Sequence, residues 1–148
     1  MSSPIFPPVT PPPVRQLRGM QLSLVGSSAG SVAADACVPF DTVDTNTTLG
    51  VTQSGGTVTI GRVGTYLVNW WVGVENTQAA ESVSFAVSVN ASDVQTSSSD
   101  IGGGQIVGTA IVNVTSVPVT LQLVNRSASS VTYVTAGVQA GLTITQLA

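Results

Sequence analysis

TYLVNWWVGVE, at residues 65–75, is the stretch that decides the fold. In an extended strand, successive side chains point to opposite faces, so this stretch divides into two files. One file holds Val68, Trp70, Val72 and Val74, and the other holds Leu67, Trp71 and Gly73. Both files are largely apolar. One face therefore fits a protein core, and the other face needs a cover of its own.

Strand patterns recur along the rest of the chain. The segment GMQLSLVG, at residues 19–26, puts Met20, Leu22 and Leu24 on one face and predicts the first strand. Further strands are predicted at 38–43, 57–60, 82–90, 105–114, 119–124, 131–135 and 138–147. Turn residues separate these runs at 55–56, 61–64, 76–80, 97–104 and 127–130. Because no segment has a helical period, the predicted fold class is all-β, a sandwich or jelly roll.

The composition supports β structure and restricts the function. Of 148 residues, 43% are hydrophobic and only 7% are charged, whereas about a quarter are charged in an average domain. The four arginines are dispersed and the net charge is −3, so nucleic acid and anionic lipid are not expected partners. Polar residues interrupt every apolar run, which argues against a membrane span. The charge deficit and the second apolar file together predict a homo-oligomer with a large apolar interface.

The N-terminus differs from the rest of the chain. Six of the eight prolines fall between residues 4 and 13. Proline lacks an amide donor and forces its predecessor into extended conformations, so we expect polyproline II rather than a helix or a central strand. At about 3.1 Å per residue the segment could reach roughly 40 Å, far enough to touch a neighbouring molecule. We divide the chain into a connector or leader at 1–18 and a domain at 19–148, with a flexible linker as the alternative for the connector. No secretory signal peptide is expected, because the first twenty residues lack its apolar core.

Catalytic and metal sites are not expected. The chain has no histidine and no lysine, so serine or cysteine nucleophiles lack their usual bases. Asp41 and Asp44, like Asp93 and Asp100, do not have the spacing of a calcium loop. Cys37 is interpreted as a small thiol in an apolar site. We therefore predict a non-enzymatic protein without cofactor or metal.

Several of these residues resemble a known family. Val38-Pro39-Phe40, then Val58, and then Gly64, Tyr66, Val68 and Trp70 are similar to the C1q/TNF-like pattern of Phe, five residues and Gly-x-Tyr-x-Phe-x-aromatic. Val58 and Val68 stand where that family has phenylalanine. The segment VQAGLTI at 138–144 is similar to the family's closing Phe-x-Gly-x-Leu-Leu strand. The resemblance covers residues 19–148 and implies a jelly roll that forms homotrimers.

Within that superfamily, the low charge and the Val, Thr and Ser content resemble the trimeric heads of collagen-like glycoproteins of the bacterial spore exosporium. Those proteins begin with short Pro-rich leaders, and the segment PIFPPVTPPP at 4–13 resembles one. A Gly-X-Y stalk is absent between leader and head. The resemblance therefore implies a subunit of thin endospore appendage fibres, located on the spore surface and held there by an anchoring protein.

The implied residue roles fall into two groups. The residues expected to dock one trimer on the next are Ile5, Phe6, Pro7, Pro8, Val9, Pro11, Pro12 and Pro13. The residues expected at the trimer interface or in the core are Phe40, Tyr66, Val68, Trp70, Trp71 and Leu142. Trp70 and Trp71 point to opposite faces, so we expect one in the core and the other at the trimer interface or under a loop. The receiving face of the trimer, and docking as a β-strand or as polyproline II, stay open.

Two other functions compete with the fibre subunit. A terminal C1q-like adhesin would cap a spore-surface or phage fibre and bind a host or carbohydrate ligand. A phage or virus fibre knob would share the trimeric β architecture and the low charge.

Overall fold

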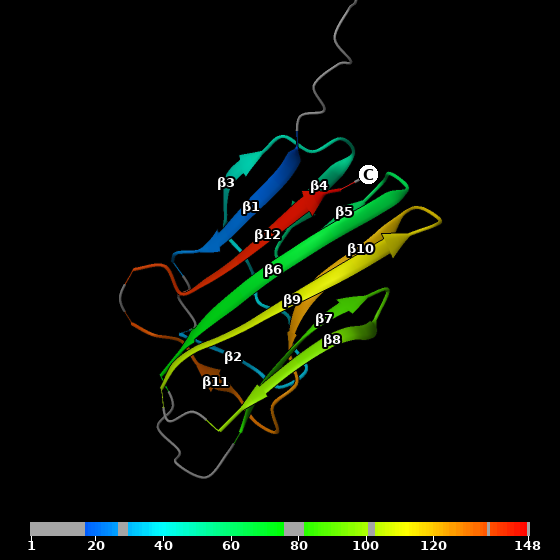
Figure 1. Ribbon diagram of the computed structural model, residues 1–148. Helices are drawn as coiled ribbons and strands as arrows, with labels where there is room; N and C mark the ends of the chain where they lie inside the picture. Colours follow the sequence, from blue (N-terminus) through cyan, green and yellow to red (C-terminus); the bar gives the residue numbers. More distant parts are fainter. Residues whose placement is uncertain (1–16, 27–29, 76–81, 101–102, 136, 148) are drawn as a thin grey trace, which may run out of the picture.

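The computed structural model describes residues 17–26, 30–75, 82–100, 103–135 and 137–147, and within them it is built from strands (Figure 1). The strands are β1 (Arg18–Leu24), β2 (Ser31–Val32), β3 (Thr42–Asn46), β4 (Val51–Ser54), β5 (Thr57–Ile60), β6 (Gly64–Val74), β7 (Val83–Val89), β8 (Ser92–Ser99), β9 (Gly104–Val114), β10 (Val119–Asn125), β11 (Val131–Thr132) and β12 (Ala140–Gln146). The predicted all-β class is confirmed. In the described part of the chain, no helix is long and apolar enough to cross a membrane.

Two antiparallel sheets form a sandwich. The β6 sheet has the order β3-β1-β12-β6-β9, and the β10 sheet has the order β4-β5-β10-β7-β8. In Figure 1 the β6 sheet lies in front, and a short third sheet of β11 and β2 lies near one end. Strands distant in sequence pair in the β6 sheet, where the last strand, β12, lies between β1 and β6. This non-sequential order is typical of a jelly roll.

The core lies between the two sheets and follows the period of two. On β6, Tyr66, Val68, Trp70 and Val72 are each at most 2% exposed, while the residues between them are more accessible. Phe85 on β7 and Leu121 on β10 face them from the other sheet and are fully buried. The Trp70 and Phe85 ring centroids lie 6.2 Å apart across the core. One file of the stretch at 65–75 therefore forms part of the core.

The prediction of a strand at 38–43 is wrong over most of its length. Val38 and Phe40 are buried, but the Phe40 N–H bonds to the Val38 carbonyl in a local turn, and β3 begins only at Thr42. Pro39 cannot donate a ladder hydrogen bond, which favours this irregular path. Two other predicted strands are shorter than expected, because β11 ends at Thr132 and β12 begins at Ala140.

Three strands were not predicted: β2, β4 and β8. The predicted turn at 97–104 overlaps the end of β8, whereas the turn at 76–80 lies outside the described residues. The turn predicted at 55–56 joins β4 and β5, and Gly55 and Gly56 have φ values of 58° and 90°. Positive φ at both positions suits the tight turn of a two-residue hairpin.

A candidate assembly face on the β6 sheet

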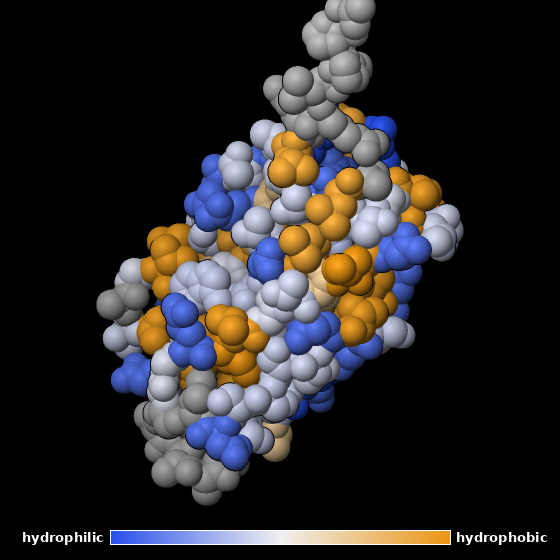
Figure 2. All heavy atoms as spheres, in the orientation of Figure 1, coloured by the Kyte–Doolittle hydropathy of each residue, from blue (hydrophilic) through white to orange (hydrophobic). Residues whose placement is uncertain are grey.

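The outward side chains of the β6 sheet form rows across its strands. Because paired residues in a sheet point to the same face, the register of β6 with β9 sets these rows. Leu67 pairs with Ile111, and Trp71 pairs with Val107, which gives two apolar rows. Ile111 is 68% exposed and Val107 is 60% exposed. Figure 2 views this face and shows hydrophobic atoms gathered in patches over it.

The three strands that carry these rows present no ionised group outward. Their outward side chains are neutral, and they are Thr65, Leu67, Asn69, Trp71, Gln105, Val107, Thr109, Ile111, Asn113, Thr143 and Thr145. A solvated face of this size normally carries charged residues. These three strands, which form one side of the β6 sheet, therefore lack outward charges, as the core of an interface does.

The outer face of the β10 sheet is different. Arg126, which follows β10, bonds through Nε and Nη2 to the Asp93 carboxylate and through Nη1 to Asp35, with N to O distances of 2.9–3.3 Å. These hydrogen bonds raise the pKa of Arg126, with the bond to Asp93 as the larger cause. Between these charges and β4 the outward side chains are hydroxyls and amides, such as Thr59, Thr120 and Gln122. Water solvates charges, hydroxyls and amides well, so the outer face of the β6 sheet, with its exposed apolar rows, is the better candidate for an interface.

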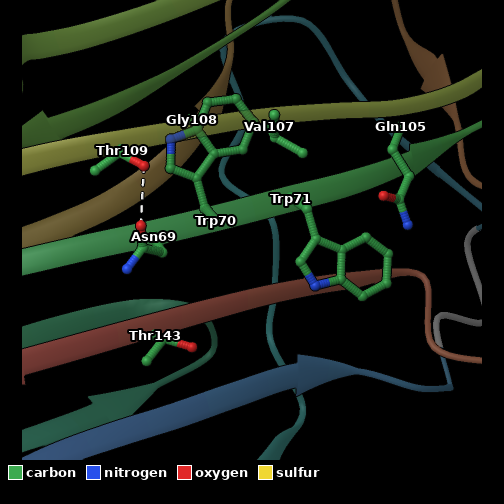
Figure 3. Close-up of a pocket in the computed structure, with 8 residues that line it drawn as sticks. All are labelled: Asn69, Trp70, Trp71, Gln105, Val107, Gly108, Thr109 and Thr143. Atoms are coloured by element: carbon green, nitrogen blue, oxygen red, sulfur yellow. Dashed lines mark hydrogen bonds between the residues drawn. The ribbon is translucent and has the colours of Figure 1, made fainter.

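Two adjacent tryptophans on β6 each cover a glycine on a neighbouring strand. Trp70 points inward over Gly108 of β9, where an added Cβ would lie 2.5 Å from the indole Cζ2 and Nε1 atoms. Trp71 points outward over Gly141 of β12, where an added Cβ would collide with the indole Nε1 and would lie 3.0 Å from Cε2. Figure 3 shows the two indoles leaving β6 toward different neighbours. Each glycine therefore leaves the space that one indole fills.

The environments of the two indoles differ. Trp70 is 2% exposed, and its Nε1 donates to Gln95 Oε1 at 3.0 Å. Trp71 is only partly buried, and none of the described residues accepts a hydrogen bond from its N–H. A Trp with a buried ring face and a free N–H is well suited to meet a partner surface.

A pocket of about 380 Å³ lies beside Trp71 (Figure 3). Its polar lining comes from Asn69, Gln105, Thr109 and Thr143, and its apolar lining from the tryptophans and Val107. The Thr109 hydroxyl donates to Asn69 Oδ1 at 2.9 Å. Without charged groups in its lining, the pocket can accept an uncharged group that presents both apolar and hydrogen-bonding atoms.

The six residues expected at the interface or in the core separate into two sets. Phe40, Tyr66, Val68, Trp70 and Leu142 lie in the core of a single protomer, each at most 2% exposed. Trp71 alone lies on the outer face, and it alone of the six offers surface to another copy. The expected docking residues Ile5, Phe6, Pro7, Pro8, Val9, Pro11, Pro12 and Pro13 lie outside the described residues.

Sequence reasoning missed the contribution of β9 to this face. Val107 and Ile111 are the most exposed large apolar residues of the sheet, yet the run at 105–114 was interpreted only as a strand. Its alternation was visible in the sequence: Gln105, Val107, Thr109, Ile111 and Asn113 form one file. The missing information was the pairing of β9 with β6, which brings the two exposed files together.

Two further titratable groups of the described residues have raised pKa values. Partial burial raises the pKa of the Cys37 thiol, which disfavours the nucleophilic thiolate. Burial also raises the pKa of Tyr133, whose hydroxyl has no hydrogen-bond partner among the described residues. Within the same ranges, no group of three or more His, Cys, Asp and Glu residues is placed to hold a metal ion.

Comparison with known proteins identifies the fold. The sequence matches no protein-family model and no curated protein sequence. Among solved structures, murine APRIL at pH 5.0 superposes with a TM-score of 0.69 at 12% identity, covering 89% of this chain and 100% of that chain. The globular domain of zebrafish complement 1qA gives 0.60 at 9% identity, covering 90% and 98%. The vertex protein P5 of PRD1 gives 0.57 at 20% identity, covering 88% and 97%. The expected C1q/TNF-like jelly roll is confirmed as the fold of this chain.

Proposed function

We propose that this protein is the structural subunit of a self-assembling extracellular fibre. Three copies associate through the outer face of the β6 sheet, and the resulting homotrimers stack through their N-terminal connectors. The observation that carries the proposal is the uncharged outer face, on which Val107 and Ile111 are exposed on β9, at the edge of the sheet.

The free energy of assembly comes largely from this face. Fully burying a Val or Ile side chain contributes about 1.5–3 kcal/mol. Val107 and Ile111 are about two-thirds exposed, so covering both contributes about 1–2 kcal/mol each in every protomer. Three protomers around an axis multiply this contribution, and partial burial of Leu67 and Trp71 adds to it. A cyclic trimer leaves two different ends for further contacts.

The connector supplies the contact between trimers. β1 begins at Arg18, at the end of the sandwich where β12 finishes (Figure 1), so in a cyclic trimer the three copies of Arg18 lie at the same level along the axis. A connector that docks on the opposite end of the next trimer makes a heterologous contact, and on a straight axis such contacts produce a filament rather than a ring. Three simultaneous contacts also raise the effective affinity. Ile5 and Phe6 are the proposed anchors, and the other proposed docking residues are Pro7, Pro8, Val9, Pro11, Pro12 and Pro13.

A spore surface is the proposed location, with the fibre acting as an endospore appendage held by an anchoring protein. The support is the resemblance of the Pro-rich leader and of the low-charge head to exosporium proteins. The protein is proposed to act without a cofactor and without catalysis.

Negative-stain electron microscopy of the purified full-length protein tests the proposal. We expect thin fibres with a regular axial repeat. A chain that lacks residues 1–14 should give discrete trimers, and I5S/F6S in the full chain should shorten the fibres. Fibres that persist without residues 1–14 would contradict connector docking, and monomers of the truncated chain at micromolar concentration would contradict the trimer.

A terminal head is the second candidate. The superposition on the vertex protein P5 of PRD1 and the uncharged pocket beside Trp71 both favour it. In that case the full-length protein stays a discrete trimer, and the search turns to its ligand or to the fibre that it caps.

A further inference from the structure

The outer face of the β6 sheet alternates between polar and apolar rows. Along the β6–β9 pair, the rows are Thr65 with Asn113, Leu67 with Ile111, Asn69 with Thr109, and Trp71 with Val107. The Asn69 row continues onto Thr143 of β12 and Gln21 of β1. A polar row of four strands thus lies between two rows that are apolar where they cross β6 and β9.

The polar row has unused hydrogen-bonding capacity. Asn69 Oδ1 accepts the Thr109 hydroxyl at 2.9 Å, but no described residue pairs with the Asn69 amide N–H groups. The Gln21 amide and the Thr143 hydroxyl are also unpaired within the described ranges. When a face of this kind is buried, unpaired amides and hydroxyls are costly unless the covering surface brings polar groups to the same place.

We propose that the Asn69 row is a polar layer that fixes the register between copies, so that they close into a ring instead of assembling in a staggered, open form. This inference rests on the proposed trimer. Its occupant is a second copy of the same chain, because rotation about a cyclic axis leaves every residue at the same height along that axis. With strands running broadly along the axis, the polar row of one copy then meets the polar row of the next, and each apolar row meets an apolar row.

A slip of one row breaks this agreement. Rows on one face are two residues apart, which is about 7 Å along a strand. After such a slip the Asn69 amide of one copy lies against Leu67 and Ile111, or against Trp71 and Val107, of the next copy. The amide then loses water without gaining a partner. A single buried Asn fixes register and stoichiometry in coiled coils for the same reason.

The test replaces the polar layer by apolar residues of similar size. N69L/T109V should still assemble at least as tightly as the wild type, but into more than one stoichiometry by native mass spectrometry. Peptides from β6 and β9 should show two hydrogen-exchange populations where the wild type shows one. The control is T65V/N113L, which makes the same chemical change on the same two strands but at the end of both. This control should stay a single species.

A second variant locates the layer independently of any packing change. N69D puts a carboxylate of each copy into the layer and should convert trimers to monomers at neutral pH, whereas N113D should not. Far-UV circular dichroism shows whether the variants retain the sheet. If N69D stays trimeric, or if N69L/T109V gives one stoichiometry and one exchange population, the polar-layer inference is wrong while the trimer stands. If the wild type itself is monomeric, the proposed function fails with it.

Discussion

Gly108→Ala is a substitution for which the structure predicts a large loss of stability from a small added group. The added Cβ would lie 2.5 Å from the Trp70 Cζ2 and Nε1 atoms, well inside van der Waals contact. Trp70 has no free path away from it, because the indole is 2% exposed and packs near the Phe85 ring. Its N–H is held by Gln95 at 3.0 Å.

The magnitude follows from two contributions. Overpacking a tight core costs about 1–3 kcal/mol, and distorting the Trp70–Gln95 hydrogen bond adds about 0.5–1.5 kcal/mol. We expect a loss of about 2–4 kcal/mol in the free energy of unfolding. With a urea m-value of about 1–3 kcal/mol/M, this shifts the unfolding midpoint down by roughly 0.7–4 M. Tryptophan fluorescence measures the midpoint, at several protein concentrations because assembly also stabilises the fold.

Gly141→Ala is the matched comparison. Its added Cβ meets the Trp71 indole just as closely, but that indole lies on the outer face and can rotate away. The unfolding midpoint of this variant should fall less, while trimer formation weakens because Trp71 leaves its place on the face. A W70F/G108A double variant should lose less than the sum of the two single variants, since the smaller ring relieves the clash. Equal midpoints for Gly108→Ala and the wild type, or strictly additive losses in the double variant, would refute the reasoning.

Three further predictions concern the outer face of the β6 sheet, the loss of stability at low pH and a buried hydroxyl in the core. Ile111→Glu should dissociate the assembly to monomers in analytical ultracentrifugation, while Val94→Glu, at a similarly exposed position on β8, should not. Asp41 accepts hydrogen bonds from the Val25 N–H, the Gly26 N–H and the Thr42 hydroxyl, which lower its pKa in the folded state. The stabilisation by ionised Asp41 is therefore present above its usual pKa of 3.8 and is lost as the pH falls through its lower pKa in the folded state. Asp41→Asn should therefore flatten the fall in the urea unfolding midpoint between about pH 4 and pH 2. Tyr133→Phe removes a buried hydroxyl that has no partner among the described residues, and it should raise the free energy of unfolding by up to about 1 kcal/mol in the same urea assay.

The sequence predicted well the strands whose alternation is strong. The run at 65–75 has apolar residues at every inward position, so its strand and its core file were recognisable without a structure. The strand β8 was missed because SDVQTSSS has no apolar file, and an edge strand that is largely exposed on both faces does not need one. β8 is held in its strand conformation by pairing with β7, and no local sequence pattern reveals that pairing. The path at 38–41 was mispredicted for a different reason, since burial of Val38 and Phe40 there serves an irregular segment.

The candidate face was only half predictable. Two apolar files on one strand indicate that a second surface is covered, and Trp71 was identified on that ground. The rows themselves depend on register, because Asn69 and Thr109 are forty residues apart and become one polar unit only when β6 pairs with β9. Register is set by the whole sandwich, so it could not be read from either segment alone.

The adjacent tryptophans show how one strand can serve folding and assembly separately. Trp70 fills the space over Gly108 in the core, and its N–H is satisfied by Gln95 within the protomer. Trp71 fills the space over Gly141 on the outer face and keeps its N–H available. Because neighbouring residues of a strand face opposite sides, a change at one position alters packing on one side only. Stability of the protomer and affinity between protomers can therefore be varied independently on this strand, and the paired glycine substitutions measure that independence directly.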